Sequence, residues 1–233
     1  MKKYFELISQ IILFKGLPDH HINELLNIAQ EKAFVKNELI FSEGDEGNGF
    51  YVTVDGLIKI YKLSLEGKEQ ILHIFGPGEP FGEVSVFSGQ TFPANAEAIN
   101  KSRALFFPRN SIVKLISENP SLALNMLAVL SQRLRHFTVQ VENLSLKEVP
   151  GRLAAHLIML SIEQEKTDTI YLNISKAQLA SLLGTIPETL SRILTRMAGQ
   201  RLIDVQGRKI KLLDVDGLEA LAQTGRIEDI ENL

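Results

Sequence analysis

The chain has 233 residues, no cysteine and a formal net charge of −3 at pH 7. This length allows two domains with proper cores, and the lack of cysteine excludes disulfides, thiolate catalysis, zinc–cysteine sites and cysteine-ligated iron–sulfur clusters. No apolar run approaches the roughly 20 residues that cross a bilayer, and no cleavable signal segment is recognisable, so we expect a cytoplasmic protein without membrane contact.

Residues 4–30 carry apolar side chains at helical spacing, and Gly16 and Pro18 divide them into two expected short helices. From about residue 33 the chain changes to short runs rich in Val, Ile, Phe and Tyr. Glycines separate these runs every 11 or 12 residues, at Gly44, Gly56, Gly67, Gly78 and Gly89. This rhythm predicts an antiparallel β-roll of about eight strands that ends near Phe107. Within it, Asp55-Gly56 predicts a hairpin between 50–54 and 57–61.

A long helix is predicted from Pro120 to about Leu146. Its apolar positions recur at three- or four-residue steps, at Leu122, Met126, Val129 or Leu130, Leu134, Phe137, Val141 and Leu144. We expect this seam to pair with its copy in a homodimer; the alternative is burial against the β-roll alone. The predicted domains are an effector-sensing domain at 1–118, a dimerisation helix at 119–146 and a DNA-binding domain at 147–233.

The stretch 175–197 predicts a helix-turn-helix. Ser175 is the expected N-cap of a first helix with Leu179, Leu182 and Leu183 on one face, and Gly184 ends it. Pro187 opens a second helix. Its buried stripe is Leu190, Ile193, Leu194 and Met197. Two helices joined by a short turn containing glycine place the second helix in the major groove of double-stranded DNA. The alternative is an ordinary helical hairpin.

The flanking segments favour DNA reading. Residues 201–213 predict two short strands about Gly207, which is the wing of a winged helix, and a helix with Leu153, His156, Leu157, Leu160 and Ile162 is expected to dock onto it. Net charge is +4 over 147–211, although it is −5 over the acidic 212–233, which we expect to fray from about Thr224. The predicted DNA contacts are Ser175, Thr185, Pro187, Glu188, Thr189, Ser191, Arg192, Arg196, Arg208 and Lys209.

An enzyme is not expected. A metal-dependent enzyme built on the β-roll needs several histidines converging from its strands, and residues 33–107 contain one, His73. Nucleophile-elbow, P-loop and His-Glu-x-x-His patterns are missing from the sequence.

Four motifs together resemble the bacterial transcription factors that include the cyclic AMP receptor protein and the fumarate-nitrate reduction regulator. They are 43–45, 50–56, 76–83 and the Glu188-x-x-Ser191-Arg192 pattern. The resemblance implies an α+β fold with an N-terminal antiparallel β-roll of the cyclic-nucleotide-binding, jelly-roll type, a long dimerisation helix and a C-terminal winged helix-turn-helix. It also implies an effector-gated homodimer that binds a palindrome and recruits RNA polymerase. Members with this reader pattern recognise TTGA half-sites, and Pro187 replaces the arginine of members that read TGTGA-type half-sites.

The predicted effector pocket departs from the cyclic-nucleotide pattern. Where members that bind cyclic AMP place an arginine against the phosphate, this chain has Phe92-Pro93, so cyclic AMP control is not expected. Apolar surface around Phe81, Phe87 and Phe92, with Gly82, suits a planar apolar ligand or none. Glu83 is expected to bond nearby backbone.

Without cysteine, the chain is similar to the nitrosative-stress and nitrate-respiration branch of these regulators, some of which use haem to sense nitric oxide. This similarity makes His20 and His21 the first candidate haem ligands, followed by His73, His136, His156 and Met126. The alternatives are a regulator that needs no effector and a cyclic-nucleotide-responsive one.

Overall fold

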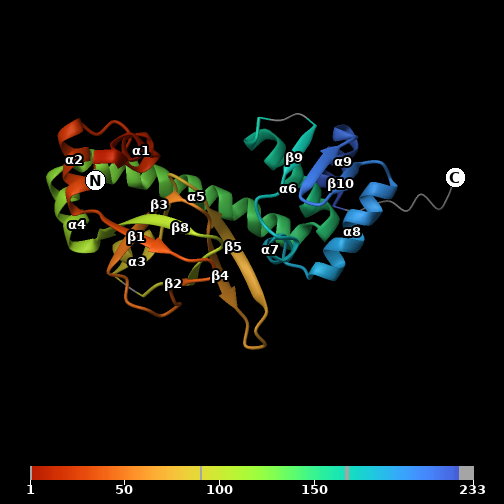
Figure 1. Cartoon of the computed structure of the whole chain (residues 1–233), viewed down its shortest axis with the longest axis horizontal. Coiled ribbons are helices and arrows are strands. Elements are labelled where there is room, and N and C mark those ends of the chain that lie inside the picture. The colour runs from red at the N-terminus through yellow and green to blue at the C-terminus, as the bar shows by residue number, and fades with distance from the viewer. Residues whose placement is uncertain (1, 90, 166–167, 226–233) are drawn as a thin grey trace. The chain divides into compact units, whose positions relative to one another are not determined.

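A computed structural model describes residues 2–89, 91–165 and 168–225 and divides the chain into two compact units, Met1–Arg135 and His136–Leu233 (Figure 1). None of the helices in the described residues is long and apolar enough to cross a membrane.

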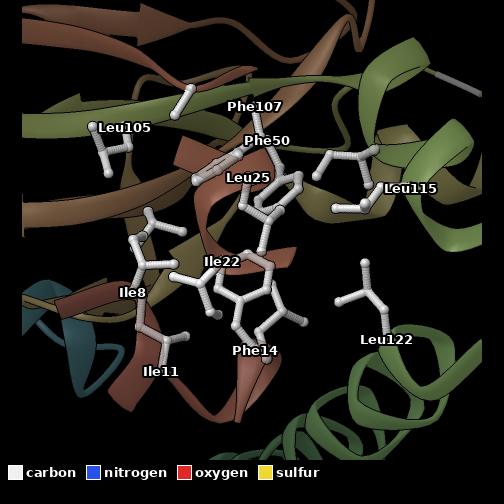
Figure 2. Packing of buried hydrophobic residues seen from close by; sticks show 14 of the residues in the cluster. Ile8, Ile11, Phe14, Ile22, Leu25, Phe50, Leu105, Phe107, Leu115 and Leu122 are labelled. Carbon is white, nitrogen blue, oxygen red and sulfur yellow. The ribbon is translucent and has the colours of Figure 1, made fainter. Parts of the chain in front are cut away.

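Two short helices precede the sheets, as predicted. They are α1 (Phe5–Gln10) and α2 (Asp19–Ile28), with 3-10 turns at Lys2–Tyr4 and Ile12–Phe14. Ile8 and Leu25 are fully buried and share one core with Phe50 and Phe107 of the sheets. Figure 2 shows these side chains gathered between the N-terminal helices and the strands. The apolar spacing therefore serves to seat the helices on the β-roll.

The described residues of the first unit form eight strands in two antiparallel sheets, in agreement with the predicted number. One sheet has the order β1-β8-β3-β6 and the other β2-β7-β4-β5. The strands are β1 (Gln30–Phe34), β2 (Leu39–Phe41), β3 (Gly49–Asp55), β4 (Ile58–Leu63), β5 (Glu69–Phe75), β6 (Pro80–Phe81), β7 (Asn95–Ala98) and β8 (Ser102–Pro108).

The predicted hairpin at Asp55-Gly56 is wrong. Strand β3 pairs with β8 and β6, whereas β4 pairs with β5 and β7, so this turn carries the chain from one sheet to the other. Gly56 has φ +81°, and a Cβ there would overlap the side chain of Ser102. Glycine is therefore required by a close crossing of two chain segments rather than by a two-residue hairpin.

Two further helices belong to the first unit: α3 (Glu83–Ser88) and α4 (Arg109–Glu118), which the sequence did not predict. Helix α5 (Pro120–Leu146), whose bounds agree with the prediction, begins in the first unit, and its residues from His136 onward belong to the second. In the first unit, Leu122, Met126 and Val129 of α5 are buried in the core. The apolar side chains of α5 that remain exposed are Leu124, Leu127 and Leu134 in the first unit and Phe137, Val139, Val141, Leu144 and Leu146 in the second.

The second unit is a winged helix-turn-helix. Its elements are α6 (Val149–Glu163), β9 (Thr169–Tyr171), α7 (Lys176–Leu182), α8 (Pro187–Gly199), β10 (Ile203–Gln206), β11 (Lys209–Leu212) and α9 (Val215–Thr224). The two predicted wing strands pair, and β9, which was not predicted, adds a third strand beside β11. Ile162 is 73% exposed, so its predicted role in docking α6 is wrong. Fraying was predicted from about Thr224; α9 runs to that residue, and the rest of the predicted segment, 226–233, lies outside the described residues.

Helices α6 and α9 pack backbone against backbone. A Cβ placed on Gly151 would lie 2.5 Å from the Cα of Gly225 and 3.0 Å from the carbonyl oxygen of Leu221. This contact leaves no room for a side chain at residue 151.

Candidate DNA interface and effector site

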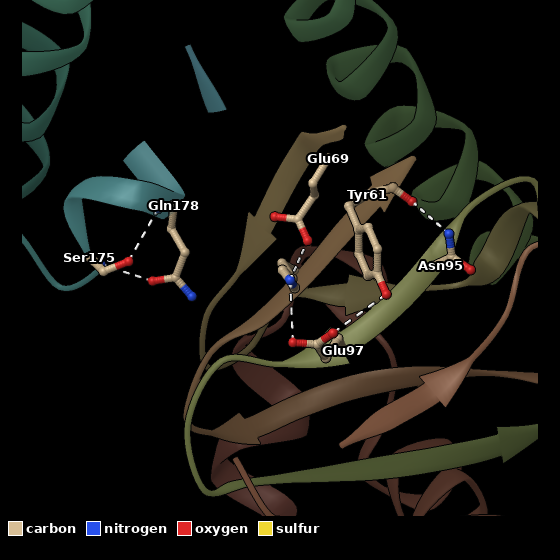
Figure 3. A network of polar contacts seen from close by, with 7 residues as sticks. Tyr61, Glu69, Asn95, Glu97, Ser175 and Gln178 are labelled. Carbon is tan, nitrogen blue, oxygen red and sulfur yellow. Dashed lines mark hydrogen bonds and ion pairs between the residues drawn. The ribbon is translucent and has the colours of Figure 1, made fainter. Parts of the chain in front are cut away.

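A capping box begins the first helix of the helix-turn-helix. The Ser175 hydroxyl accepts from the backbone N–H of Gln178 at 3.2 Å, and the Gln178 side chain accepts from the N–H of Ser175 at 2.9 Å (Figure 3). The reciprocal pair satisfies two backbone donors that a helix start leaves free. Ser175, which the sequence predicts to contact DNA, therefore fixes the start of α7.

The turn between the two helices uses Gly184 at φ +68°, and the N–H of Thr185 donates to the carbonyl of Ala180 at 2.9 Å. Pro187 then occupies the first turn of α8, where its missing N–H has no helical partner to lose. Thr185 is half-buried in the turn before α8, and Pro187 is exposed at the first residue of that helix.

The two faces of α8 are separated as the sequence predicted. Leu190, Ile193, Leu194 and Met197 are buried, while the opposite face exposes Glu188, Ser191, Arg192 and Arg196 and leaves Thr189 half-buried. A guanidinium nitrogen of Arg192, Nη2, donates to Thr189 Oγ1 at 3.2 Å. An exposed helix face with two guanidinium groups, one carboxylate and hydroxyls carries the donors and acceptors that read base edges in a major groove.

The wing brings two basic side chains to the same unit. Strands β10 and β11 are joined through Gly207 at φ +63°, and both Arg208 and Lys209 are exposed at this turn. Cations at a wing tip are suited to backbone phosphates, which position a protein on DNA without reading its sequence.

The interior of the β-roll, where the effector pocket is predicted, is filled by aromatic rings. Phe92 stacks on Phe41 with ring centroids 3.7 Å apart and planes 9° apart, and Tyr51 stacks on Phe81 at 5.1 Å. Phe81 is fully buried and Phe92 is 5% exposed. Burial raises the pKa of Tyr51.

Gly82 fits tightly into this aromatic cluster. Its φ is +76°, and a Cβ there would lie 3.2 Å from the ring of Phe92 and 3.3 Å from that of Phe41. The remaining predicted pocket residues do not join the cluster: Phe87 is 39% exposed on α3, and Pro93 is exposed. The prediction that Phe87 contributes sequestered apolar surface is therefore wrong, because α3 turns that side chain outward.

We expected Glu83 to bond nearby backbone, but it binds a side chain of the long helix instead. Arg133 of α5 forms an ion pair with the Glu83 carboxylate and donates to the carbonyl oxygen of Pro80. Its guanidinium carbon also lies 5.1 Å from the ring centroid of Phe75. Glu83 is 5% exposed, so the pair compensates a buried carboxylate. The sequence could have indicated Arg133 as a buried partner, because it follows Met126 and Val129 at helical spacing on the buried stripe of α5.

A second polar network lies on the other sheet of the roll (Figure 3). Lys59, which is 7% exposed, binds Glu69 at 2.5 Å and Glu97 at 3.3 Å, and Tyr61 shares Glu97 at 3.4 Å. The two carboxylates compensate the buried lysine, so Lys59 is not available as a cation for a ligand.

The candidate haem ligands do not fit a haem. An axial ligand must face an enclosed apolar cavity, but His20 is exposed and His21 is half-buried with Nδ1 3.0 Å from Glu24 Oε2. His73 is half-exposed beside Phe75, and His136 is exposed.

Met126 is also unsuitable, because its side chain is 4% exposed inside the packed core. His156 lies on α6 of the second unit and not in the β-roll, and burial lowers its pKa to about 4. Within the described ranges, no group of three His, Cys, Asp or Glu side chains could hold a metal ion.

Two family models match the chain in order. Residues 31–119 match the cyclic nucleotide-binding domain and residues 151–221 match the Crp-like helix-turn-helix domain. The cyclic AMP receptor protein of Thermus thermophilus is 30% identical over 210 residues, which are 90% of this chain and 96% of that protein. The CRP-like cAMP-activated global transcriptional regulator of Mycobacterium tuberculosis is 27% identical over 222 residues, which are 94% and 99% of the two chains.

Among solved structures, that of FixK2 from Bradyrhizobium japonicum superimposes with a TM-score of 0.75 at 28% identity, over 83% of this chain and 97% of that one. The matched models and these relatives belong to transcriptional regulators and not to enzymes. The order of β-roll, long helix and winged helix-turn-helix, with identity that extends over both units, shows that the chain belongs to the CRP/FNR family of DNA-binding transcriptional regulators.

Proposed function

We propose that the chain acts as a homodimer on a palindromic TTGA-type site and that an effector in its β-roll controls this binding. Residues 147–233 bind DNA, 119–146 dimerise and 1–118 sense the effector. The observation that carries the proposal is the exposed face of α8, on which Glu188, Ser191 and Arg192 stand together. Arg192 can donate to guanine O6 and N7, and Glu188 can accept from a cytosine N4 amine.

A salt-controlled titration tests this reading. We expect wild-type protein to bind a TTGA-x6-TCAA duplex more tightly than a TGTGA-type duplex or a scrambled one. Arg192→Ala should cost about 1–3 kcal/mol on the TTGA site and relax preference at the guanine. An unchanged affinity of the variant would show that Arg192 does not contact the bases.

The wing supplies a matched control. Arg208→Ala should weaken binding equally on all three duplexes and reduce the salt slope by about one, because it removes a phosphate contact rather than a base contact. A sequence-dependent loss would instead make the wing part of base readout.

The exposed apolar side chains of α5 support the homodimer. Leu127 is 58% exposed in the first unit, and Phe137 is 44% exposed in the second. We expect Leu127→Glu to shift the sedimentation coefficient from that of a dimer to that of a monomer and to abolish binding to the palindrome. Recruitment of RNA polymerase to the same duplex, tested by gel shift, completes the proposed role.

The ion pair between Glu83 and Arg133 supports control by the β-roll, because it joins the predicted effector site to the long helix. We do not propose cyclic AMP as the effector, because Phe92 is buried at the position where the phosphate needs an arginine. The resemblance also suggested that the chain senses nitrosative stress through haem. The positions of the histidines argue against it, and we expect a haem titration without oxygen to give no stoichiometric absorption band.

A further inference from the structure

One hydroxyl inside the β-roll lacks a partner. Thr53 of β3 is 0% exposed, and its Oγ1 has no hydrogen-bond partner among the described residues. Its backbone is fully bonded, with the N–H donating to Glu79 at 3.0 Å and the carbonyl accepting from Gly78 at 2.8 Å. A buried hydroxyl without a partner costs free energy in the folded protein, so the position of Thr53 calls for an explanation.

Thr53 faces the aromatic interior of the roll. Along β3, Phe50 and Val52 belong to the core beneath the N-terminal helices, and successive side chains of a strand point to opposite faces. Tyr51 and Thr53 therefore share the other face. Tyr51 packs against the cluster of aromatic rings, and Ala104, which pairs with Thr53 across the sheet, belongs to the same cluster.

The walls around this face are flat and apolar. Phe41, Phe75, Phe81 and Phe92 are all buried in one cluster, and Tyr51 lies 6.0 Å from Phe41 and 5.1 Å from Phe81. Aromatic walls of this kind favour a planar ring.

The charges at this site already neutralise one another. The guanidinium of Arg133 is bound by Glu83 and by the carbonyl of Pro80. An anionic ligand would have to break this buried pair, at the cost of leaving Glu83 without its partner.

We propose that the β-roll binds a small, uncharged, planar ligand with one hydrogen-bonding group, a phenol-sized molecule whose polar edge meets the Thr53 hydroxyl. This ligand class rests on the proposed control of DNA binding by the roll and specifies its effector.

Phe92 is the ring that makes way for the ligand. The other four rings stand on strands, whereas Phe92 follows α3 between the exposed residues Thr91 and Pro93. The N–H of Phe92 donates to the carbonyl of Asp45 and its carbonyl accepts from Gly44, at 2.9 Å each, so the backbone of the segment is held independently of the ring.

Calorimetric titration of the full-length protein with phenol and toluene tests the assignment, because these probes differ by one hydroxyl. The phenol-to-toluene affinity ratio should fall about 2- to 10-fold in Thr53→Val, which keeps the shape of the side chain and removes its hydroxyl. Phe92→Ala should bind phenol more tightly than wild type. Benzoate and cyclic AMP, both charged, should bind more weakly than phenol.

An equal phenol-to-toluene ratio in wild type and Thr53→Val would overturn the proposal, as would benzoate binding as tightly as phenol. Absence of phenol binding in both wild type and Phe92→Ala would also overturn it. The melting temperature of Thr53→Val should not fall, since the variant loses only a hydroxyl without a partner. Affinity for the TTGA duplex is measured on the same samples. If wild type does not bind this duplex but the phenol-to-toluene ratio still falls in Thr53→Val, the proposed DNA site is contradicted and the ligand assignment stands.

Discussion

A guanidinium nitrogen of Arg192 donates to the hydroxyl of Thr189, 3.2 Å away and one turn back on the exposed face of α8. The bond holds the arginine in one orientation before DNA arrives. Fixing a flexible side chain in advance lowers the entropy lost on binding.

We therefore expect Thr189→Val to weaken binding to the TTGA duplex by about 0.5–1.5 kcal/mol while the salt slope stays constant. Thr189→Ser should restore affinity. Thr195→Val is the control, because Thr195 also lies exposed on α8 but donates only to the carbonyl of Ser191. A lower salt slope in Thr189→Val would show that Thr189 contacts a phosphate instead.

The contact between Arg133 and Glu83 should be strongly coupled. Arg133→Met leaves a buried carboxylate without its cation, so we expect urea unfolding of the first unit to show a loss of about 3–5 kcal/mol. The double variant with Glu83→Gln should recover much of that loss. Lys114→Met, which breaks an exposed pair with Glu118, should cost at most about 0.5 kcal/mol. Additive losses in the double variant would contradict the coupling.

Acid should destabilise the second unit through His156. Burial lowers its pKa to about 4, from 6.5 in the unfolded chain, so the unfolded chain binds more protons between these values. The contribution of neutral His156 to the free energy of unfolding is therefore fully present above pH 6.5. It falls by up to about 3 kcal/mol as the pH drops towards 4. Unfolding curves of wild type and His156→Gln across this range should diverge accordingly, and parallel curves would refute the assignment.

Gly151 and Gly199 provide a matched pair in the second unit. Gly151→Ala would force a Cβ to 2.5 Å from the backbone of Gly225, whereas a Cβ at Gly199 meets nothing within 4 Å. Gly151→Ala should lower the free energy of unfolding by about 1–3 kcal/mol, and Gly199→Ala should leave it equal or raise it by up to about 1 kcal/mol. Thermal melts that rank the two variants in the opposite order would contradict the close packing of α6 on α9.

Local patterns predicted the elements that local chemistry controls. Pro120 marked the start of α5, and the stripe ending in Met197 marked the buried face of α8, because helix periodicity is read directly from spacing. The Asp55-Gly56 dipeptide misled for the same reason: it reports a turn, but packing of the interior decides which sheet the next strand joins. The three-residue strand β9 is too short to leave a periodic pattern.

Some residues of the candidate site could likewise be predicted from local pattern, and others could not. The exposed residues of α8 follow from its periodicity, so Glu188 and Arg192 could be placed in advance. The partner of Glu83 is 50 residues away on α5, and no local pattern links the two. The partner could be predicted only by noticing that the apolar stripe of α5 has one charged member, Arg133.

The crossing at Gly56 has a consequence for how the β-roll can be made. Because β1, β3, β6 and β8 of one sheet are interleaved along the chain with β2, β4, β5 and β7 of the other, a cut at any connection leaves both fragments with strands that lack a neighbour. Most pairings therefore join distant residues, such as Gln30 with Phe106, and such long-range closure is slow. During synthesis the roll acquires its interior only after β8 has emerged, so nascent chains shorter than about 108 residues should remain protease-sensitive along their whole length.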